Sequence, residues 1–339
     1  MRALISRRGA VLLLVLLLVL VAATGCGGSN TASSGASTAA TLAAASGVDA
    51  AQVVKDSEAK MATVKSAAFT ADFALQVQGD TTKMTDPTAK ALLSQGITLH
   101  AEGASAKEPT AADMTMSLGI AGQNLDFGMK SSGKKSWLEY QGTWYALDGK
   151  NAKALDKQAQ TGAAPTEQLK SMGIDPSTWG TTFQMVGTED LNGVQVYHVK
   201  AAADPQKLAQ SLTKAAESPS LGSKLGGSSS QLGQLSQGLT QNKAQAEQLA
   251  KTLKDATVEY WIGVDDQYMY KAQFGGAMDT SSQKDMQGVT GVTMKGAVTM
   301  SKFDEPVTVT PPTGAKSFKE FMNQLFGGML GGSSGGLTL

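Results

Sequence analysis

Arginine, histidine and cysteine are scarce in this chain of 339 residues, and each scarcity narrows the possible functions. The three arginines, Arg2, Arg7 and Arg8, all lie in the first eight residues, so 26 lysines and 29 carboxylates account for the charge of the rest. Nucleic-acid binding draws on basic patches and on bidentate arginine contacts, and we therefore expect no nucleic-acid partner. A single cysteine can form neither an internal disulfide nor a multi-cysteine metal site.

The two histidines, His100 and His198, are far apart in the sequence, and neither has a second ligand at metal-site spacing. Two strings approach catalytic motifs but lack the required context. Residues 331–335 read G-x-S-x-G in a Gly/Ser-rich tail, and residues 128–135 approach a phosphate-binding loop with Lys135 in place of the required Ser or Thr. We expect no metal site, no cofactor and no enzymatic activity.

The first 26 residues have the pattern of a lipoprotein signal. The arginines precede an apolar run, Ala10–Ala23, which is shorter than the roughly 20 residues needed to span a bilayer. The run ends in Ala-Thr-Gly-Cys at residues 23–26, which resembles a bacterial lipobox. The only cysteine thus stands at the expected cleavage point. We expect residues 1–25 to be a signal peptide and Cys26 to be lipidated.

Lipidation of Cys26 implies a protein tethered to the cell membrane on its extracytoplasmic face. Several acyl chains anchor a protein firmly, because each buried CH₂ contributes about 0.8 kcal/mol. Residues 26–47 are an uncharged tract rich in Gly, Ser, Thr and Ala, and a flexible chain of that length reaches roughly 25 Å. We expect these residues to be a flexible linker between the anchor and a folded domain.

The folded part is predicted to begin with a helix and continue as a series of strands. Asp49 and Gln52 form a pair like a capping box at the start of the helix. Apolar and polar residues then alternate strictly over 69–77, as in a half-buried strand, and again over 97–101, 114–120 and 125–129. Residues 135–140 and 144–147 predict a hairpin that turns at Gln141-Gly142.

The second half of the chain mixes helices and strands. Short helices are predicted at 150–160 and 166–172, and a helical insertion at about 204–255, opened by Asp204 and interrupted by a Gly/Ser-rich break at 219–230. Within it, Leu232–Leu253 has apolar residues at alternating spacings of three and four. Strands are predicted at 182–187, 194–202, 257–264, 268–275 and 292–300.

A last helix is predicted from Ser317, with Glu320 in the capping-box position, a wide apolar stripe and a docking place on the sheet. Residues 327–339 are expected to be a Gly-rich disordered tail. Strands joined by short polar turns predict an antiparallel sheet with one face against a core. The expected fold class is α+β: a large curved antiparallel sheet, a half-barrel, packed against helices in a single domain over residues 48–326.

The order of these elements resembles the LolA-like lipoproteins, and in particular the LppX/LprG-type lipid-binding lipoproteins of actinobacteria. Four stretches carry the likeness: 61–73, the hairpin Trp137–Tyr145, 193–199, and 259–265 around Trp261. The resemblance covers most of residues 49–325. It implies a half-barrel sheet wrapped around helices, enclosing an apolar cavity that binds acyl chains.

Candidate residues for lining that cavity are the inward-facing positions of the alternating strands. They are Phe69, Phe73, Leu75, Val77, Leu99, Met114, Met116, Leu118, Leu125, Phe127, Met129, Met294 and Met300. Methionine adapts to irregular apolar surfaces and so suits variable lipid tails. The same residues would equally fill a dry core between sheet and helices, and only the family resemblance favours a cavity.

The function expected from the resemblance is that of a membrane-anchored lipoprotein that binds or carries lipids or lipid-linked molecules, such as a lipoglycan. The alternative is a surface lipoprotein that does not bind lipid and acts as a protein-interaction or scaffolding module through Leu232–Leu253. An enclosed apolar pocket of several hundred Å³ or more would distinguish the first function from the second. The sequence names no protein partner.

Overall fold

The computed structural model describes residues 47–83, 87–147, 149, 179–208, 210–211, 252–281 and 288–323. Two helices lie wholly in this part, α2 (Ala50–Thr63) and α3 (Pro87–Gln95), with a 3₁₀ turn, η1 (Thr81–Lys83), between β1 and α3. Helical residues also follow Asp204, from residue 205, and form a C-terminal helix over 318–323. The strands are β1 (Ser66–Gly79), β2 (Ile97–Ala106), β3 (Ala111–Ile120), β4 (Gln123–Ser132), β5 (Lys135–Tyr140), β6 (Thr143–Ala146), β7 (Thr182–Leu191), β8 (Val194–Ala202), β9 (Leu253–Gly263), β10 (Met269–Asp279), β11 (Val289–Ser301) and β12 (Lys316–Ser317).

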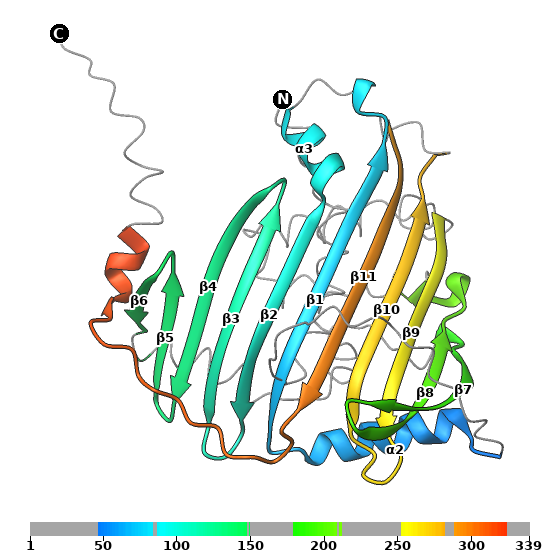
Figure 1. Ribbon diagram of the computed structural model, residues 1–339. Helices are drawn as coiled ribbons and strands as arrows, with labels where there is room; N and C mark the ends of the chain where they lie inside the picture. Colours follow the sequence, from blue (N-terminus) through cyan, green and yellow to red (C-terminus); the bar gives the residue numbers. More distant parts are fainter. Residues whose placement is uncertain are drawn as a thin grey trace.

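The twelve strands form one open sheet, in the order β12-β6-β5-β4-β3-β2-β1-β11-β10-β9-β8-β7 (Figure 1). Neighbouring strands are antiparallel, except that β12 runs parallel to β6. The order resolves into two meanders, β1–β6 and β7–β11, joined where β1 pairs with β11. The expected fold, a large curved antiparallel sheet packed against helices, is confirmed.

Helix α2 begins where the sequence predicts it. Asp49 caps the helix: its Oδ1 accepts hydrogen bonds from the backbone N–H groups of Ala51 at 2.9 Å and Gln52 at 3.3 Å. The second half of the predicted capping box does not form, because the Gln52 side chain donates to Asp56 Oδ1 at 2.7 Å instead of reaching back. One aspartate is thus enough to fix the start of the helix.

Helix α3 was not predicted. Its nine residues give too short an apolar period to recognise, although Pro87 at its first position is typical of a helix start. Leu93 packs into a buried cluster with Leu75 and Val77 of β1. Tertiary packing therefore stabilises a helix that is too short to be stable alone.

The predicted hairpin is confirmed as β5 and β6. Gln141 and Gly142 both have positive φ angles, 49° and 76°, which is the backbone that a two-residue hairpin turn matched to strand twist requires. The predicted helix start at Asp204 is also present, since its Oδ1 accepts from the backbone N–H groups of Gln206 and Lys207. Both features are set by residues close in sequence.

Several predictions fall on residues outside the described part of the chain. These are the signal peptide and most of the linker, the helices at 150–160 and 166–172, most of the insertion with its break at 219–230, and the tail. One correction is possible at the end of the insertion. Leu253 begins β9, so the predicted helix over Leu232–Leu253 does not include its last residue, because that residue pairs with Met278 of β10.

Candidate functional site

Strand register places all thirteen candidate residues on one face of the sheet, which we call the inner face. Phe73 of β1 lies opposite Leu99 of β2, Leu99 lies opposite Leu118 of β3, and Leu118 lies opposite Leu125 of β4. On the other side of β1, Leu75 lies opposite Met294 of β11. Because directly paired residues point to the same face, the alternation seen within each strand continues across the sheet. The residues so aligned are Phe69, Phe73, Leu75, Val77, Leu99, Met114, Met116, Leu118, Leu125, Phe127, Met129, Met294 and Met300.

Helices α2 and α3 cover separate parts of the inner face, at opposite ends of the strands (Figure 1). Ala50 and Val54 of α2 pack on Val199 of β8 and Ile262 of β9, both fully buried. Leu93 of α3 packs near the β1–β11 pairing at the other end. Five of the candidate residues on β1 and β11 are buried as ordinary core residues: Phe69, Phe73, Leu75, Val77 and Met300.

The inner face of β3 and β4 is more open, and we call its apolar residues the β3–β4 wing. Met116 and Ile120 are 38% and 39% exposed, whereas Leu75 of β1 is 1% exposed. The other members are half-buried: Met114, Leu118, Leu125, Phe127 and Met129. These large apolar side chains are neighbours and are all partly exposed. Such a surface favours contact with an apolar partner or ligand.

Two aromatic rings meet over a glycine at the centre of the inner face. Phe73 and Phe274 are stacked with ring centroids 6.2 Å apart, although they belong to β1 and β10, which are separated by β11. Gly296 lies between them, and a Cβ at that position would come within 2.0 Å of Phe274 Cζ. Phe274 was not among the candidate residues predicted from sequence alternation. A glycine on the strand that follows it, Gly296, was the one sequence feature related to its position.

The C-terminal helix docks at the β5–β6 end of the sheet, as predicted. Ser317 and Glu320 form the predicted capping box: the Ser317 N–H donates to Glu320 Oε2 at 2.8 Å and the Glu320 N–H donates to Ser317 Oγ at 3.3 Å. Phe321 is buried against the rings of Tyr140 and Tyr145, with centroids 5.9 and 5.2 Å away. Tyr140 in turn contacts Phe127, so an aromatic chain links this helix to the β3–β4 wing.

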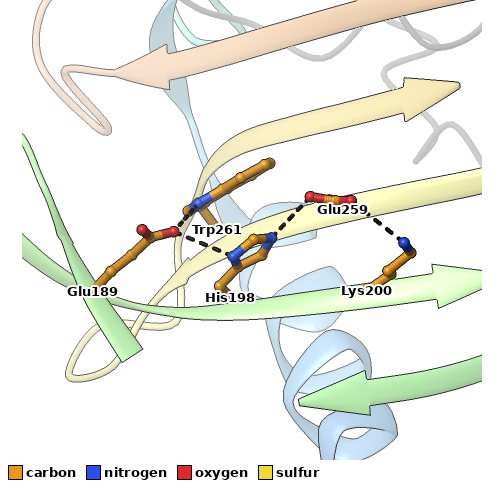
Figure 2. Close-up of polar contacts among 5 residues, drawn as sticks. All are labelled: Glu189, His198, Lys200, Glu259 and Trp261. Atoms are coloured by element: carbon orange, nitrogen blue, oxygen red, sulfur yellow. Dashed lines mark hydrogen bonds and ion pairs between the residues drawn. The ribbon is translucent and has the colours of Figure 1, made fainter. Parts of the chain in front are cut away.

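The opposite face of the sheet, which we call the outer face, carries both histidines. His100 Nδ1 lies 2.7 Å from Asp72 Oδ1 on the neighbouring strand. His198 lies between two glutamates from the two neighbouring strands, Glu189 of β7 and Glu259 of β9 (Figure 2). Both histidines thus lie within strands and face carboxylates of the neighbouring strands.

Burial shifts the pKa of several side chains around the sheet. Desolvation of the Tyr260 hydroxyl, together with the nearby charge of Glu58 on α2, raises its pKa to about 12. Desolvation, with a hydrogen bond to Asp266, raises the pKa of Tyr270 as well. Desolvation lowers the pKa of Lys271, against the opposing effect of Glu189 and Glu259. None of these three groups belongs to the β3–β4 wing.

Within the described ranges, no group of three or more His, Cys, Asp or Glu side chains is placed to hold a metal ion. Among the same residues, no helix combines the length and apolar character of a membrane span. Cys26, the predicted lipidation site, lies outside the described residues.

Neither the known family models nor the curated proteins include a match to this chain. Among solved structures, the chain is similar to the lipoprotein LppX of Mycobacterium tuberculosis, with 15% identity over 76% of this chain and 97% of that chain and a TM-score of 0.33. LprF of Mycobacterium bovis matches with 12% identity over 78% and 97% and a TM-score of 0.36. A LolA superfamily protein of Nitrosomonas europaea matches with 8% identity over 77% and 96% and a TM-score of 0.18.

Proposed function

We propose that this protein is a membrane-anchored extracytoplasmic lipoprotein that binds or carries lipids, or lipid-linked molecules, through their acyl chains. One observation carries the lipid-binding part: the β3–β4 wing continues the packed inner face but leaves Met116 and Ile120 more than a third exposed. An acyl chain laid on this wing would cover apolar surface that the described helices leave open. Binding requires no reaction, and the protein is proposed to be a carrier without enzymatic activity.

The chemistry of the wing suits an acyl chain and not a charged group. The large inner-face residues of β3 and β4 are aliphatic, aromatic or methionine, except Gln123 at the end of β4, and the charged residues Asp113, Asp126 and Lys130 lie on the outer face by register. Each CH₂ removed from water stabilises a complex by about 0.8 kcal/mol. Methionine side chains can rearrange around chains of different shape. Affinity is therefore expected to depend on chain length more than on the head group.

The proposed anchor is the lipidated Cys26 at the end of the signal peptide. It is supported by the N-terminal arginines, the short apolar run and the position of the only cysteine. The linker of residues 26–47 would hold the sheet at an r.m.s. distance of roughly 25 Å from the anchor. Such a distance would let the domain exchange a lipid with the membrane that holds it.

A matched pair of substitutions on β3 tests lipid binding. Met116 lies on the inner face and Thr115, its exposed neighbour, on the outer face. We expect Met116→Gln to weaken binding of a fluorescent long-chain fatty acid by about fivefold, because it places an amide against the chain. Thr115→Gln should bind as the unchanged protein does. Equal affinities in both variants, or no binding by the unchanged protein, would refute the proposed site.

A second variant separates a ligand surface from a closed core. Leu118→Trp adds volume at a half-buried position of the wing. If the wing contacts a ligand, the variant should carry less lipid in native mass spectrometry and unfold in urea at nearly the same midpoint. In a close-packed core the same change would cost about 1–3 kcal/mol of stability. A large loss of stability, with no lipid in the unchanged protein, would leave the scaffolding function, whose Leu232–Leu253 segment lies almost wholly outside the described residues.

A further inference from the structure

The outer face holds a cluster of ionisable residues that the proposed lipid site does not use (Figure 2). His198 of β8 is mostly buried, and both of its ring nitrogens face carboxylates: Nε2 lies 3.0 Å from Glu259 Oε2, and Nδ1 lies 3.3 Å from Glu189 Oε1. The imidazole is stacked on the indole of Trp261, with ring centroids 4.4 Å apart. The ring is therefore fixed in a position where both nitrogens meet an acceptor.

A neutral imidazole has one N–H donor and one nitrogen with a lone pair, whereas an ionised carboxylate only accepts. A neutral His198 can donate to one glutamate but must turn a lone pair toward the other. A doubly protonated His198 attracts both. The geometry points to His198 as a proton-controlled clamp that joins the edge strand β7 to β9 when the ring carries two protons.

The other charged groups around the ring belong to the same cluster. Lys200, on the strand of His198, lies 3.9 Å from Glu259 Oε1, and Lys271 of β10 lies 4.1 Å from the centre of the Trp261 ring. The Trp261 indole N–H donates to Glu189 Oε1, the oxygen that faces His198. When His198 loses a proton, Glu189 therefore keeps its hydrogen bond from the Trp261 indole. The contact between β7 and its neighbours then weakens but is not lost.

Strand β7 is the element that such a clamp would control. It is the last strand in the sheet order, paired only with β8 among the described residues, and its register with β8 shifts between Met185 and Gly187. Gly187 stands opposite His198 in this pairing. Because the protonated ring favours the paired arrangement, β7 is held most firmly below the pH at which the ring loses its second proton. It loosens as pH rises through that value.

Hydrogen exchange of the β7 amides, followed by NMR between about pH 5 and pH 8, tests the clamp without any ligand. After correction for intrinsic exchange, we expect protection of β7 to fall by about two- to fivefold as pH rises, the factor typical of partly exposed charge pairs. Amides of β3 should show no such change. Nitrogen chemical shifts of the His198 ring, recorded on the same samples, would report whether the ring is doubly protonated or neutral at each pH.

His198→Gln should remove the pH dependence of β7, and the control His100→Gln should keep it, since His100 pairs with Asp72 near the centre of the sheet. Protection of β7 that stays constant with pH in the unchanged protein would overturn the proposal. So would ring shifts that report a neutral His198 throughout. Both of these measurements use the unchanged protein, so they decide the question even if His198→Gln does not fold.

Discussion

Gly296 shows how a single residue without a side chain shapes the inner face. Its missing Cβ allows the Phe274 ring to lie across β11 and stack on Phe73. We predict that Gly296→Ala forces the ring aside and lowers the free energy of unfolding by about 1–3 kcal/mol. Urea denaturation would measure this change.

Gly275→Ala is the matched control for that prediction. Gly275 is also a strand glycine, on β10, but a Cβ there would meet nothing closer than Thr257 Oγ1 at 3.7 Å. This variant should be as stable as the unchanged protein or slightly more stable, because alanine restricts the unfolded chain. If both alanine variants unfold alike, the aromatic pair does not depend on Gly296.

Asp304 predicts a pH dependence of stability. The backbone N–H of Lys65 donates to Asp304 Oδ1 at 2.7 Å and lowers the pKa of this carboxyl below its ordinary 3.8; the hydroxyl of Tyr268, 2.9 Å from Oδ2, adds to the effect. A depressed pKa means that the ionised carboxylate stabilises the fold above pH 3.8, and that this contribution is lost as pH falls through the lower native value.

Asp304→Asn should therefore melt at a lower temperature than the unchanged protein at neutral pH, with the difference closing below pH 3.8. Asparagine tolerates the positive φ angle of 59° at this position, so the backbone is not the cause of any change. Thermal melts from about pH 2 to pH 7 would measure the difference. A gap that persists unchanged at the acid end would show that the carboxylate charge has no role.

Individual residues could be assigned to a face from sequence, but their contacts could not. Alternation is a local property, and it placed Met116, Leu118 and Phe127 on one side correctly. The hydrogen bond from Lys65 to Asp304 and the stacking of Phe73 on Phe274 join residues that are distant in sequence. No period in the sequence records which strand lies beside which.

At the scale of elements, the predictions succeeded where short-range chemistry decides. The turn at Gln141-Gly142 and the capping boxes or caps at Asp49 and Ser317 involve residues within three positions of each other. Helix α3 was missed because its nine residues depend on contacts of Leu93 with β1. Local signals therefore fix where elements begin, and packing decides whether a short element exists.

The docking of the C-terminal helix gives a prediction for this element. Phe321 is 9% exposed and contacts two tyrosines, whereas Met322 beside it is 37% exposed. We predict that Phe321→Ala lowers the free energy of unfolding by about 3 kcal/mol, and that Met322→Ala changes it little. Chemical denaturation and binding of the dye ANS would follow the exposure of apolar surface. A stable Phe321→Ala variant that loses binding to liposomes would identify the helix as a membrane contact instead.

For the whole molecule, the fold class was predictable and the strand order was not. Alternating strands with polar turns indicated a large antiparallel sheet, and such patterns give a meander wherever consecutive strands are joined by short turns. The pairing of β1 with β11 brings Phe69 opposite Met300 and has no local signal. The β3–β4 wing likewise depends on which strands the helices cover, which alternation does not record.

The proposed anchor makes a prediction about the whole molecule. If Cys26 is lipidated as proposed, Cys26→Ser should release the protein from the membrane fraction and leave the sheet folded, since the described residues begin at Gly47. Cell fractionation would locate the variant, and circular dichroism of the released protein would confirm its strand content. A variant that stays with washed membranes would contradict lipidation at this cysteine.

The joining of two meanders at β1 and β11 also has a consequence for how the protein is made. During synthesis the first meander can pair its strands as they appear, but β1 keeps one side open until β11 has been made. Pairing between segments so distant in sequence is slow, because the entropy cost of closing a long loop comes before the stabilising contacts form. During that delay the open edge of β1 can pair with another chain and aggregate. The edge of β1, the first strand, is thus covered only when β11, the last long strand, pairs with it.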